Sequence, residues 1–264
     1  MEYRPITCNS LVKKITKTDP LFKGMYCVDP YQNCEFGCLY CDSSFGKTIY
    51  VKTNANAILN KEIENLEKGV IVIGSVHDPY QKSEGKYEIT KNLLKTIKKY
   101  HFPCHILTKS TLVLRDINLL TDMQCLVTIS IVSLDANISH VFEKNVPSPK
   151  ERLQTVKILT EHGIKTGVAL IPVLPFLVES ELEDIVHMAS SFNAQYLLHK
   201  YLELKGEQKK AFRNVIQNHY LHLLSNLDEL YKDDFKPGEN YVATLDQRMY
   251  RLCKKYKIPG KIVL

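Results

Sequence analysis

Apolar, β-rich runs alternate with amphipathic stretches over most of this chain, and this alternation constrains the fold more than any other feature. Strands that are separated by helices pair in parallel in one sheet. The crossovers are right-handed, so the sheet is either open and doubly wound or curled towards a barrel. The apolar runs are residues 25–28, 70–74, 105–107, 126–132, 165–171 and 195–202, and the amphipathic stretches are residues 57–68, 87–100, 150–162 and 179–192.

The pattern changes after Leu204. A longer helix is predicted over residues 206–224, and a polar, basic tail with a weaker helical pattern follows it. We therefore predict an α/β unit over residues 1–204 and a helical extension, packed on that unit, over residues 205–264. The length of 264 residues suits one large domain of this kind.

Composition excludes several classes of protein. Apolar residues make up 44% and charged residues 24% of the chain, which is typical of a globular protein and not of a disordered one. The most apolar stretch, residues 167–178, is too short to span a membrane and contains two prolines. The N-terminal segment does not resemble a secretory signal, so we expect a cytoplasmic protein without membrane association. The net charge of +6 is compatible with an anionic partner but does not require one.

Three of the eight cysteines, Cys34, Cys38 and Cys41, follow the spacing C-x3-C-x2-C. Cysteines in a cytoplasmic chain favour metal binding or catalysis over a disulfide framework. Soft thiolate ligands select zinc, copper(I) or iron–sulfur clusters. Structural zinc takes four protein ligands, whereas three thiolates on one loop leave a position open for chemistry. The alternative is a non-catalytic zinc or iron–sulfur module, with Cys8, Cys27 or a histidine as the fourth zinc ligand.

The cysteine segment resembles the radical S-adenosylmethionine enzymes, whose C-x3-C-x-aromatic-C signature follows the first strand. The resemblance implies that Cys34, Cys38 and Cys41 bind three irons of a [4Fe–4S] cluster, whose fourth iron is chelated by S-adenosylmethionine. It also implies that Tyr40 packs near the adenine and that the cluster loop occupies residues 30–53. The family fold is a partial (βα)6 TIM-like barrel, which agrees with the six apolar runs.

Further segments resemble the spore photoproduct lyase-like branch of this family. The resemblance runs from about residue 26 to residue 224. It departs from the branch at two places: residues 74–78 lack the cysteine that donates hydrogen in the lyase, and Asp42 replaces a tyrosine after the last cluster cysteine. The resemblance therefore implies the radical chemistry rather than the lyase reaction itself. The matching segments include Gly74-Ser75-Val76-His77-Asp78-Pro79-Tyr80-Gln81, Thr108-Lys109-Ser110, Arg115-Asp116 and Thr128-Ile129-Ser130-Ile131.

Polar side chains follow the predicted strands at the end where ligands bind in a parallel barrel. We expect Asp78 to accept hydrogen bonds from a ribose or an ammonium group, and Lys109 to neutralise the methionine carboxylate. The alternative is that Asp78 only initiates a turn and that Lys109 is solvated. The predicted cofactor-binding residues are Tyr40, Ser75, Asp78, Lys109, Ser130 and Ser133.

His77 and Tyr80 are the candidate catalytic residues, because they lie near the predicted site and no donor cysteine is present. A lone histidine is more often structural, so this role has a plain alternative. Tyr201 and Glu203 follow the last predicted strand and could face the substrate. Cys104 and Cys125 begin their strands, at the other end of the barrel, and are expected to be small buried hydrophobic residues.

The resemblance predicts reductive cleavage of S-adenosylmethionine to a 5′-deoxyadenosyl radical, which abstracts hydrogen from a substrate. It implies carbon–carbon lyase-like chemistry and a low-potential electron donor of the flavodoxin or ferredoxin type. The substrate is either nucleic acid or a peptide or small metabolite. Lysines of the extension would support contacts with a nucleic-acid backbone, although solvated helix faces explain them as well. These lysines are Lys205, Lys209, Lys210, Lys254, Lys255 and Lys257.

Overall fold

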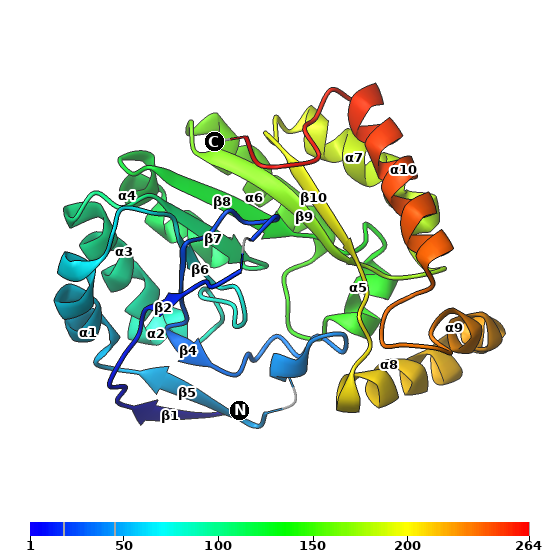
Figure 1. The fold of residues 1–264 in the computed structure, drawn as a ribbon, viewed down its shortest axis with the longest axis horizontal. Coiled ribbons are helices and arrows are strands. Elements are labelled where there is room, and N and C mark those ends of the chain that lie inside the picture. The colour runs from blue at the N-terminus through cyan, green and yellow to red at the C-terminus, as the bar shows by residue number, and fades with distance from the viewer. Residues whose placement is uncertain (18, 45, 264) are drawn as a thin grey trace.

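A seven-stranded sheet forms the centre of the molecule, in the order β10-β9-β8-β7-β6-β3-β2 (Figure 1). The computed structural model describes residues 1–17, 19–44 and 46–263. Only β2 is antiparallel to its neighbour, and the other neighbouring strands pair in parallel. The strands are β2 (Lys13–Lys14), β3 (Tyr26–Val28), β6 (Ile71–Ile73), β7 (Cys104–Thr108), β8 (Cys125–Ser130), β9 (Lys165–Val173) and β10 (Leu197–Tyr201).

This sheet confirms the predicted fold class. The six parallel strands coincide with the six apolar runs, and β2 and β10 remain as the two edges of the sheet. Central strands such as β6 and β8 are buried along their whole length, as expected where helices cover a parallel sheet. The sheet is therefore an open, partial barrel of the predicted type.

The crossovers between the parallel strands carry helices, of which α6 (Pro149–Glu161) has the clearest signals in the sequence. Ser148 forms a capping box with Glu151, and Pro149 occupies the first turn. Gly163, at φ +73°, follows the end of the helix. The other crossover helices are α1 (Ala55–Glu62), α2 (Glu84–Tyr87), α3 (Ile89–Lys99), α4 (Ile117–Thr121), α5 (Ala136–Phe142) and α7 (Leu182–Ser191).

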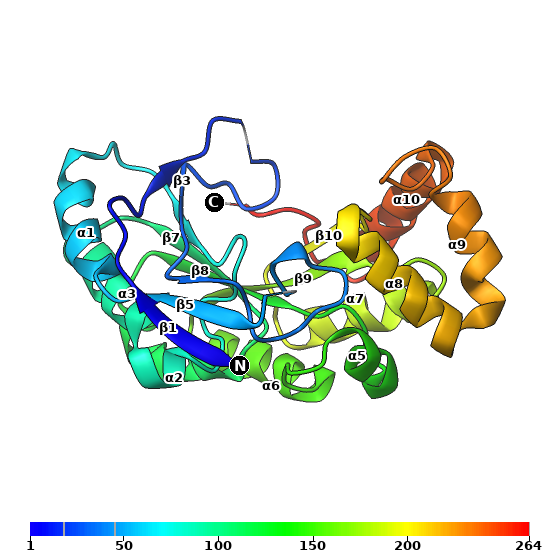
Figure 2. The same cartoon turned by 90° about the horizontal axis from the view of Figure 1, so that it is seen from below.

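A second, three-stranded sheet was not predicted. It consists of β1 (Glu2–Ile6), β5 (Thr48–Lys52) and β4 (Tyr31–Gln32), with β5 in the middle. Figure 2 shows β1 and β5 side by side, and Figure 1 shows both strands below the large sheet. β4 and β5 lie on either side of the cysteine triplet in the sequence and pair antiparallel. The small sheet therefore holds both ends of the cysteine loop together.

The C-terminal helices lie together at one end of the molecule, beyond β10 (Figures 1 and 2). They are α8 (Gly206–His219), α9 (Leu224–Leu230) and α10 (Glu239–Lys255). The helix predicted over residues 206–224 ends early, because Tyr220 leaves the helical region at φ −142° and ψ 46°. The division of the chain at residue 204 stays a prediction. No helix in the described part of the chain has the length and apolarity to cross a bilayer.

Gly167 in β9 makes a close approach that predicts a stability effect. A Cβ atom there would lie 2.1 Å from the ring of Tyr196, and the Tyr196 hydroxyl is hydrogen-bonded to Thr128 at 2.7 Å. We expect Gly167→Ala to lower the free energy of unfolding by about 1–3 kcal/mol through overpacking. Urea unfolding followed by circular dichroism measures this. The control is Gly85→Ala, because Gly85 is exposed and its nearest neighbour would be 4.0 Å away. Equal stabilities would contradict the prediction.

Candidate active site

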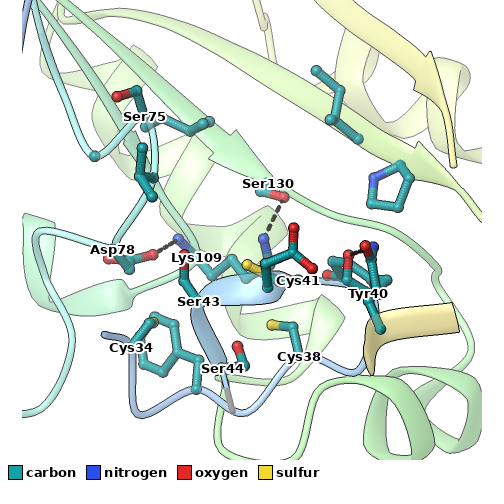
Figure 3. A pocket seen from close by; sticks show the side chains of 18 of the residues that line it. Cys34, Cys38, Tyr40, Cys41, Ser43, Ser44, Ser75, Asp78, Lys109 and Ser130 are labelled. Atoms are coloured by element: carbon teal, nitrogen blue, oxygen red, sulfur yellow. Dashed lines mark hydrogen bonds between the residues drawn. The ribbon is translucent and has the colours of Figure 1, made fainter. Parts of the chain in front are cut away.

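A cavity of about 470 Å³ opens at the carboxyl ends of the parallel strands, next to the cysteine loop (Figure 3). Its volume is typical of small-molecule sites. The ends of β6 to β9 contribute to its wall, and so does the segment that follows β10. Eight of the predicted metal-binding and cofactor-binding residues line it, namely Cys34, Cys38, Tyr40, Cys41, Ser75, Asp78, Lys109 and Ser130.

The cysteine loop folds back on itself through its own backbone. The amide of Cys41 donates to the carbonyl of Cys38 at 3.1 Å, and the amide of Cys34 donates to the carbonyl of Ser43 at 3.0 Å. Gly37 between the cysteines has φ +67°, a conformation that favours glycine. Burial raises the pKa of the Cys34 thiol to about 12 and raises that of Cys38 as well. Metal binding to these thiols would therefore release protons.

The segment after α5 holds the loop along its length. An isolated antiparallel bridge joins Cys38 to Glu143. Three hydrogen bonds extend this contact in both directions, so the loop is held to one segment at Glu35, Phe36 and Leu39. These bonds are Leu39 N to Phe142 O at 2.9 Å, Asn145 N to Phe36 O at 3.1 Å and Asn145 Nδ2 to Glu35 O at 3.0 Å.

A fully buried ion pair lies behind the loop. Arg152 Nη2 donates to Glu143 Oε2 at 2.6 Å, and Arg152 Nη1 donates to the carbonyl of Ser130 at 2.9 Å. The Tyr40 hydroxyl donates to the other carboxylate oxygen. Burial acts to raise the pKa of Glu143, but Arg152, Lys109 and the Tyr40 hydrogen bond outweigh it, so the net shift is downward. Glu143 is therefore an anion, and together with Arg152 it joins the loop, β8 and α6.

Lys109 presents its ammonium group to the cavity. Its Nζ donates to Ser130 Oγ at 3.0 Å and lies 4.0 Å from Glu143 Oε1. Figure 3 shows it between Asp78 and Ser130, beside the cysteine loop. Burial acts to lower the pKa of Lys109, but its electrostatic interactions with Cys38 and Glu143 outweigh the burial and raise the pKa. The side chain is therefore a fixed cation.

The Asp78 carboxylate is already bound by groups of the protein. It accepts from the Thr108 hydroxyl at 2.6 Å and from the backbone amides of Tyr80 at 2.9 Å and Lys109 at 2.7 Å. These bonds connect the turn after β6 to the end of β7. Burial raises the pKa of Asp78, although the hydrogen bonds oppose this shift. Asp78 lines the cavity, and its contacts position Lys109.

The structure does not bring the two candidate catalytic residues into the cavity. His77 lies beside Asp29, with 3.8 Å between Nδ1 and Oδ1. Tyr80 is fully buried and donates its hydroxyl to Asp116 Oδ2 at 3.0 Å. The turn at Asp78 directs the Asp78 carboxylate to the cavity wall and directs the side chains of His77 and Tyr80 away from the cavity. His77 and Tyr80 therefore lie outside the lining of the cavity, and a catalytic role for either stays a prediction.

Ser133 also lies outside the cavity, whereas Ser130 lines it. The Ser133 hydroxyl is buried and donates to Glu181 at 2.9 Å, because the chain has turned away from the site three residues after β8 ends. Sequence reasoning missed Glu143 and Arg152. Arg152 lies four residues before Val156, on the apolar stripe of its helix. A charged residue on an apolar stripe was the signal in the sequence that could have identified it.

The comparisons with known proteins decide the family. Residues 28–189, more than half of the chain, match the family model described as the Radical SAM superfamily. The chain belongs to this superfamily. An uncharacterized protein of Mycobacterium tuberculosis is 27% identical to it over 279 residues, which cover 98% of this chain and 82% of that protein.

Solved structures of radical SAM enzymes share the fold. Spore photoproduct lyase complexed with dinucleoside spore photoproduct has a TM-score of 0.73 at 16% identity, covering 98% of this chain and 80% of that one. Streptococcus suis SuiB bound to precursor peptide SuiA has a TM-score of 0.54 at 17% identity, covering 77% of this chain and 46% of that one. These similarities confirm the predicted resemblance and the fold. Membership of the superfamily implies a [4Fe–4S] cluster and S-adenosylmethionine.

The donor set in the cavity fits such a cluster better than structural zinc. Among the described residues, no histidine lines the cavity, and neither Cys8 nor Cys27 does. Cys8 instead contacts Asn54. Within the same residues, no three histidine, cysteine, aspartate or glutamate side chains, Cys34, Cys38 and Cys41 included, are grouped closely enough to hold a single metal ion. The cavity thus offers three thiols from one loop and no fourth thiol or imidazole.

The buried ion pair predicts a large loss of stability when it is broken. Arg152→Met would leave Glu143 without its main counter-charge, and breaking such a pair costs about 3–5 kcal/mol. Chemical unfolding of the metal-free protein measures this. The control is Arg213→Met, because the Arg213–Asp228 pair is exposed and contributes under about 1 kcal/mol. If both variants lost the same amount, the buried pair would not stabilise the fold as described.

Proposed function

We propose that this chain is a [4Fe–4S]-dependent radical SAM enzyme that cleaves S-adenosylmethionine and abstracts hydrogen from a substrate. Cys34, Cys38 and Cys41 are the cluster ligands. The observation that carries the proposal is that three thiols of one loop and the Lys109 ammonium face the same cavity. When bound, the cluster supplies one electron that splits the sulfonium of S-adenosylmethionine into methionine and a 5′-deoxyadenosyl radical.

Lys109 and Ser130 bind the methionine part of S-adenosylmethionine in this proposal. The Lys109 ammonium neutralises the carboxylate, and its bond to Ser130 aims it into the cavity. Tyr40 packs beside the adenine, with its hydroxyl kept on Glu143. Ser75 is exposed after β6 and is available to the sugar.

The cavity wall supports radical chemistry because it offers few competing hydrogen donors. The only thiols among its described lining residues are the three of the cysteine loop. Cys104 and Cys125 are buried at the starts of β7 and β8, at the other end of these strands. Apolar side chains complete the wall, including Phe36, Leu107, Ile171 and Leu202.

Tyr201 is a further candidate for the hydrogen donor, because it lines the cavity whereas His77 and Tyr80 do not. It lines the cavity after a register shift in β10, and Glu203 lines the same wall. Glu203 binds Lys200 at 2.8 Å and Lys205 at 2.7 Å, so this single carboxylate offsets one of the two positive charges. This pairing does not favour a long polyanion over a peptide or a small metabolite. Ultraviolet-irradiated DNA is the first substrate to test, because spore photoproduct lyase binds a dinucleoside photoproduct.

The test of the proposed function is formation of 5′-deoxyadenosine. Anaerobically reconstituted protein, reduced with dithionite, is expected to produce it from S-adenosylmethionine. Cys38→Ala is expected to abolish it, because two thiolates cannot hold the cluster in place of three. Liquid chromatography with mass spectrometry measures the product, and iron and zinc analysis measures the metal. Zinc without iron, and no product, would instead indicate a structural metal module.

Removal of the Lys109 charge predicts a specific loss of cofactor affinity. Hydrogen bonds to charged groups contribute about 1.5–3 kcal/mol, so Lys109→Met is expected to weaken S-adenosylmethionine binding about ten- to hundredfold. Equilibrium dialysis on cluster-loaded protein measures the dissociation constant. Iron content provides the control and should not change. An unchanged dissociation constant with a lower turnover rate would argue against a carboxylate-binding role.

A further inference from the structure

A second hollow also borders the cysteine loop. We call it the outer groove. It has a volume of about 430 Å³, and parts of the chain that are far apart in the sequence form it. The loop supplies one wall, and the segments after β7 and α5 supply others. The lining residues that matter here are Phe36, Lys82, Leu112, Lys144 and Val146.

Phe36 connects this groove to the cavity. Its side chain is 2% exposed and lines both hollows, and the two share no other described residue. Cys34 and Cys38 lie two residues away on either side of it in the chain. The neighbouring glycine packs against the groove, because a Cβ at Gly37 would lie 3.7 Å from Lys144 Cβ. A single aromatic side chain therefore belongs to the wall of the groove and to the wall that faces the thiols.

The charge of the groove is positive. Lys82 and Lys144 are exposed, and neither forms an ion pair or side-chain hydrogen bond with the described residues. No carboxylate lines the groove in the described part of the chain. The apolar side chains of Leu112 and Val146 contribute to the same surface. An apolar centre with a charged rim is typical of a protein–protein interface, and here the rim complements an anionic partner.

We propose that the outer groove is the docking site of a small acidic electron-transfer protein that carries a reduced flavin or iron–sulfur centre. The proposal rests on the proposed function, which requires a one-electron reductant. In the transfer, the partner is oxidised by one electron and the cluster is reduced by one electron, with no atom exchanged. Because Phe36 is the only described residue that the groove and the cavity share, the partner docks without displacing S-adenosylmethionine or the substrate.

Charge reversal tests this docking surface. The variant is Lys82→Glu with Lys144→Glu. The matched control is Lys61→Glu with Lys165→Glu, which changes the net charge equally. Lys61 and Lys165 are exposed, and Lys165 begins β9, at the end of the strand away from the cavity. The probes are flavodoxin hydroquinone as the protein donor and reduced methyl viologen as a small donor. Stopped-flow absorbance measures cluster reduction, and calorimetry measures binding of oxidised flavodoxin.

Electrostatic steering changes association rates by about ten- to a thousandfold, so we expect at least a tenfold slower reduction by flavodoxin at low salt. The affinity for oxidised flavodoxin should fall in parallel, and higher salt should reduce both differences. Reduction by methyl viologen and the control variant should not change. Equal rates in the two variants would overturn the proposal. Loss of duplex DNA binding with unchanged flavodoxin kinetics would also overturn it and assign the groove to nucleic acid.

The same experiment separates this inference from the proposed function. If wild-type protein forms no 5′-deoxyadenosine with methyl viologen, the proposed function has failed. If methyl viologen supports the reaction and charge reversal leaves flavodoxin-driven reduction unchanged, only the docking site has failed.

Discussion

The buried pair of Glu143 and Arg152 organises the site. A carboxylate with no exposure to water needs a close counter-charge, and Arg152 provides it at 2.6 Å. The same carboxylate accepts from Tyr40 and attracts Lys109. Cysteine loop, β8 and α6 therefore meet at one anion. The position of the cation in the cavity and the position of the thiols depend on each other through this contact.

The rest of the molecule holds these parts in place. The parallel strands bring Lys109 and Ser130 to neighbouring strand ends, because β7 and β8 pair in register. The small sheet closes the base of the cysteine loop, and α8 contacts it from the other side. Gln208 donates to the carbonyl of Tyr40, and Phe212 packs against Phe142 with 5.1 Å between ring centroids. The loop is thus supported by the small sheet, by α8 and by the end of α5.

Local sequence signals predicted the features that depend on local chemistry. Strand alternation gave the parallel sheet, and cysteine spacing gave the candidate ligands. β1 escaped prediction because most of its residues are exposed and its partner, β5, lies more than forty residues later. The sequence could not show that His77, Tyr80 and Ser133 lie outside the cavity, because a strand end fixes the position of a residue but not the direction of its side chain. Glu143 was missed because its partners on the cavity side, Tyr40 and Lys109, come from distant segments of the chain.

The long-range contact between Tyr40 and Glu143 determines the order in which the site can assemble during synthesis. Tyr40 and Glu143 are 103 residues apart, so a ribosome completes the cysteine loop well before it makes the anion behind the loop. Domains synthesised from the N-terminus fold as their parts emerge. During that interval three neighbouring thiols have their small sheet but lack their buried support. The redox state of these thiols in the nascent chain therefore depends on the cellular environment and not on burial in the folded protein.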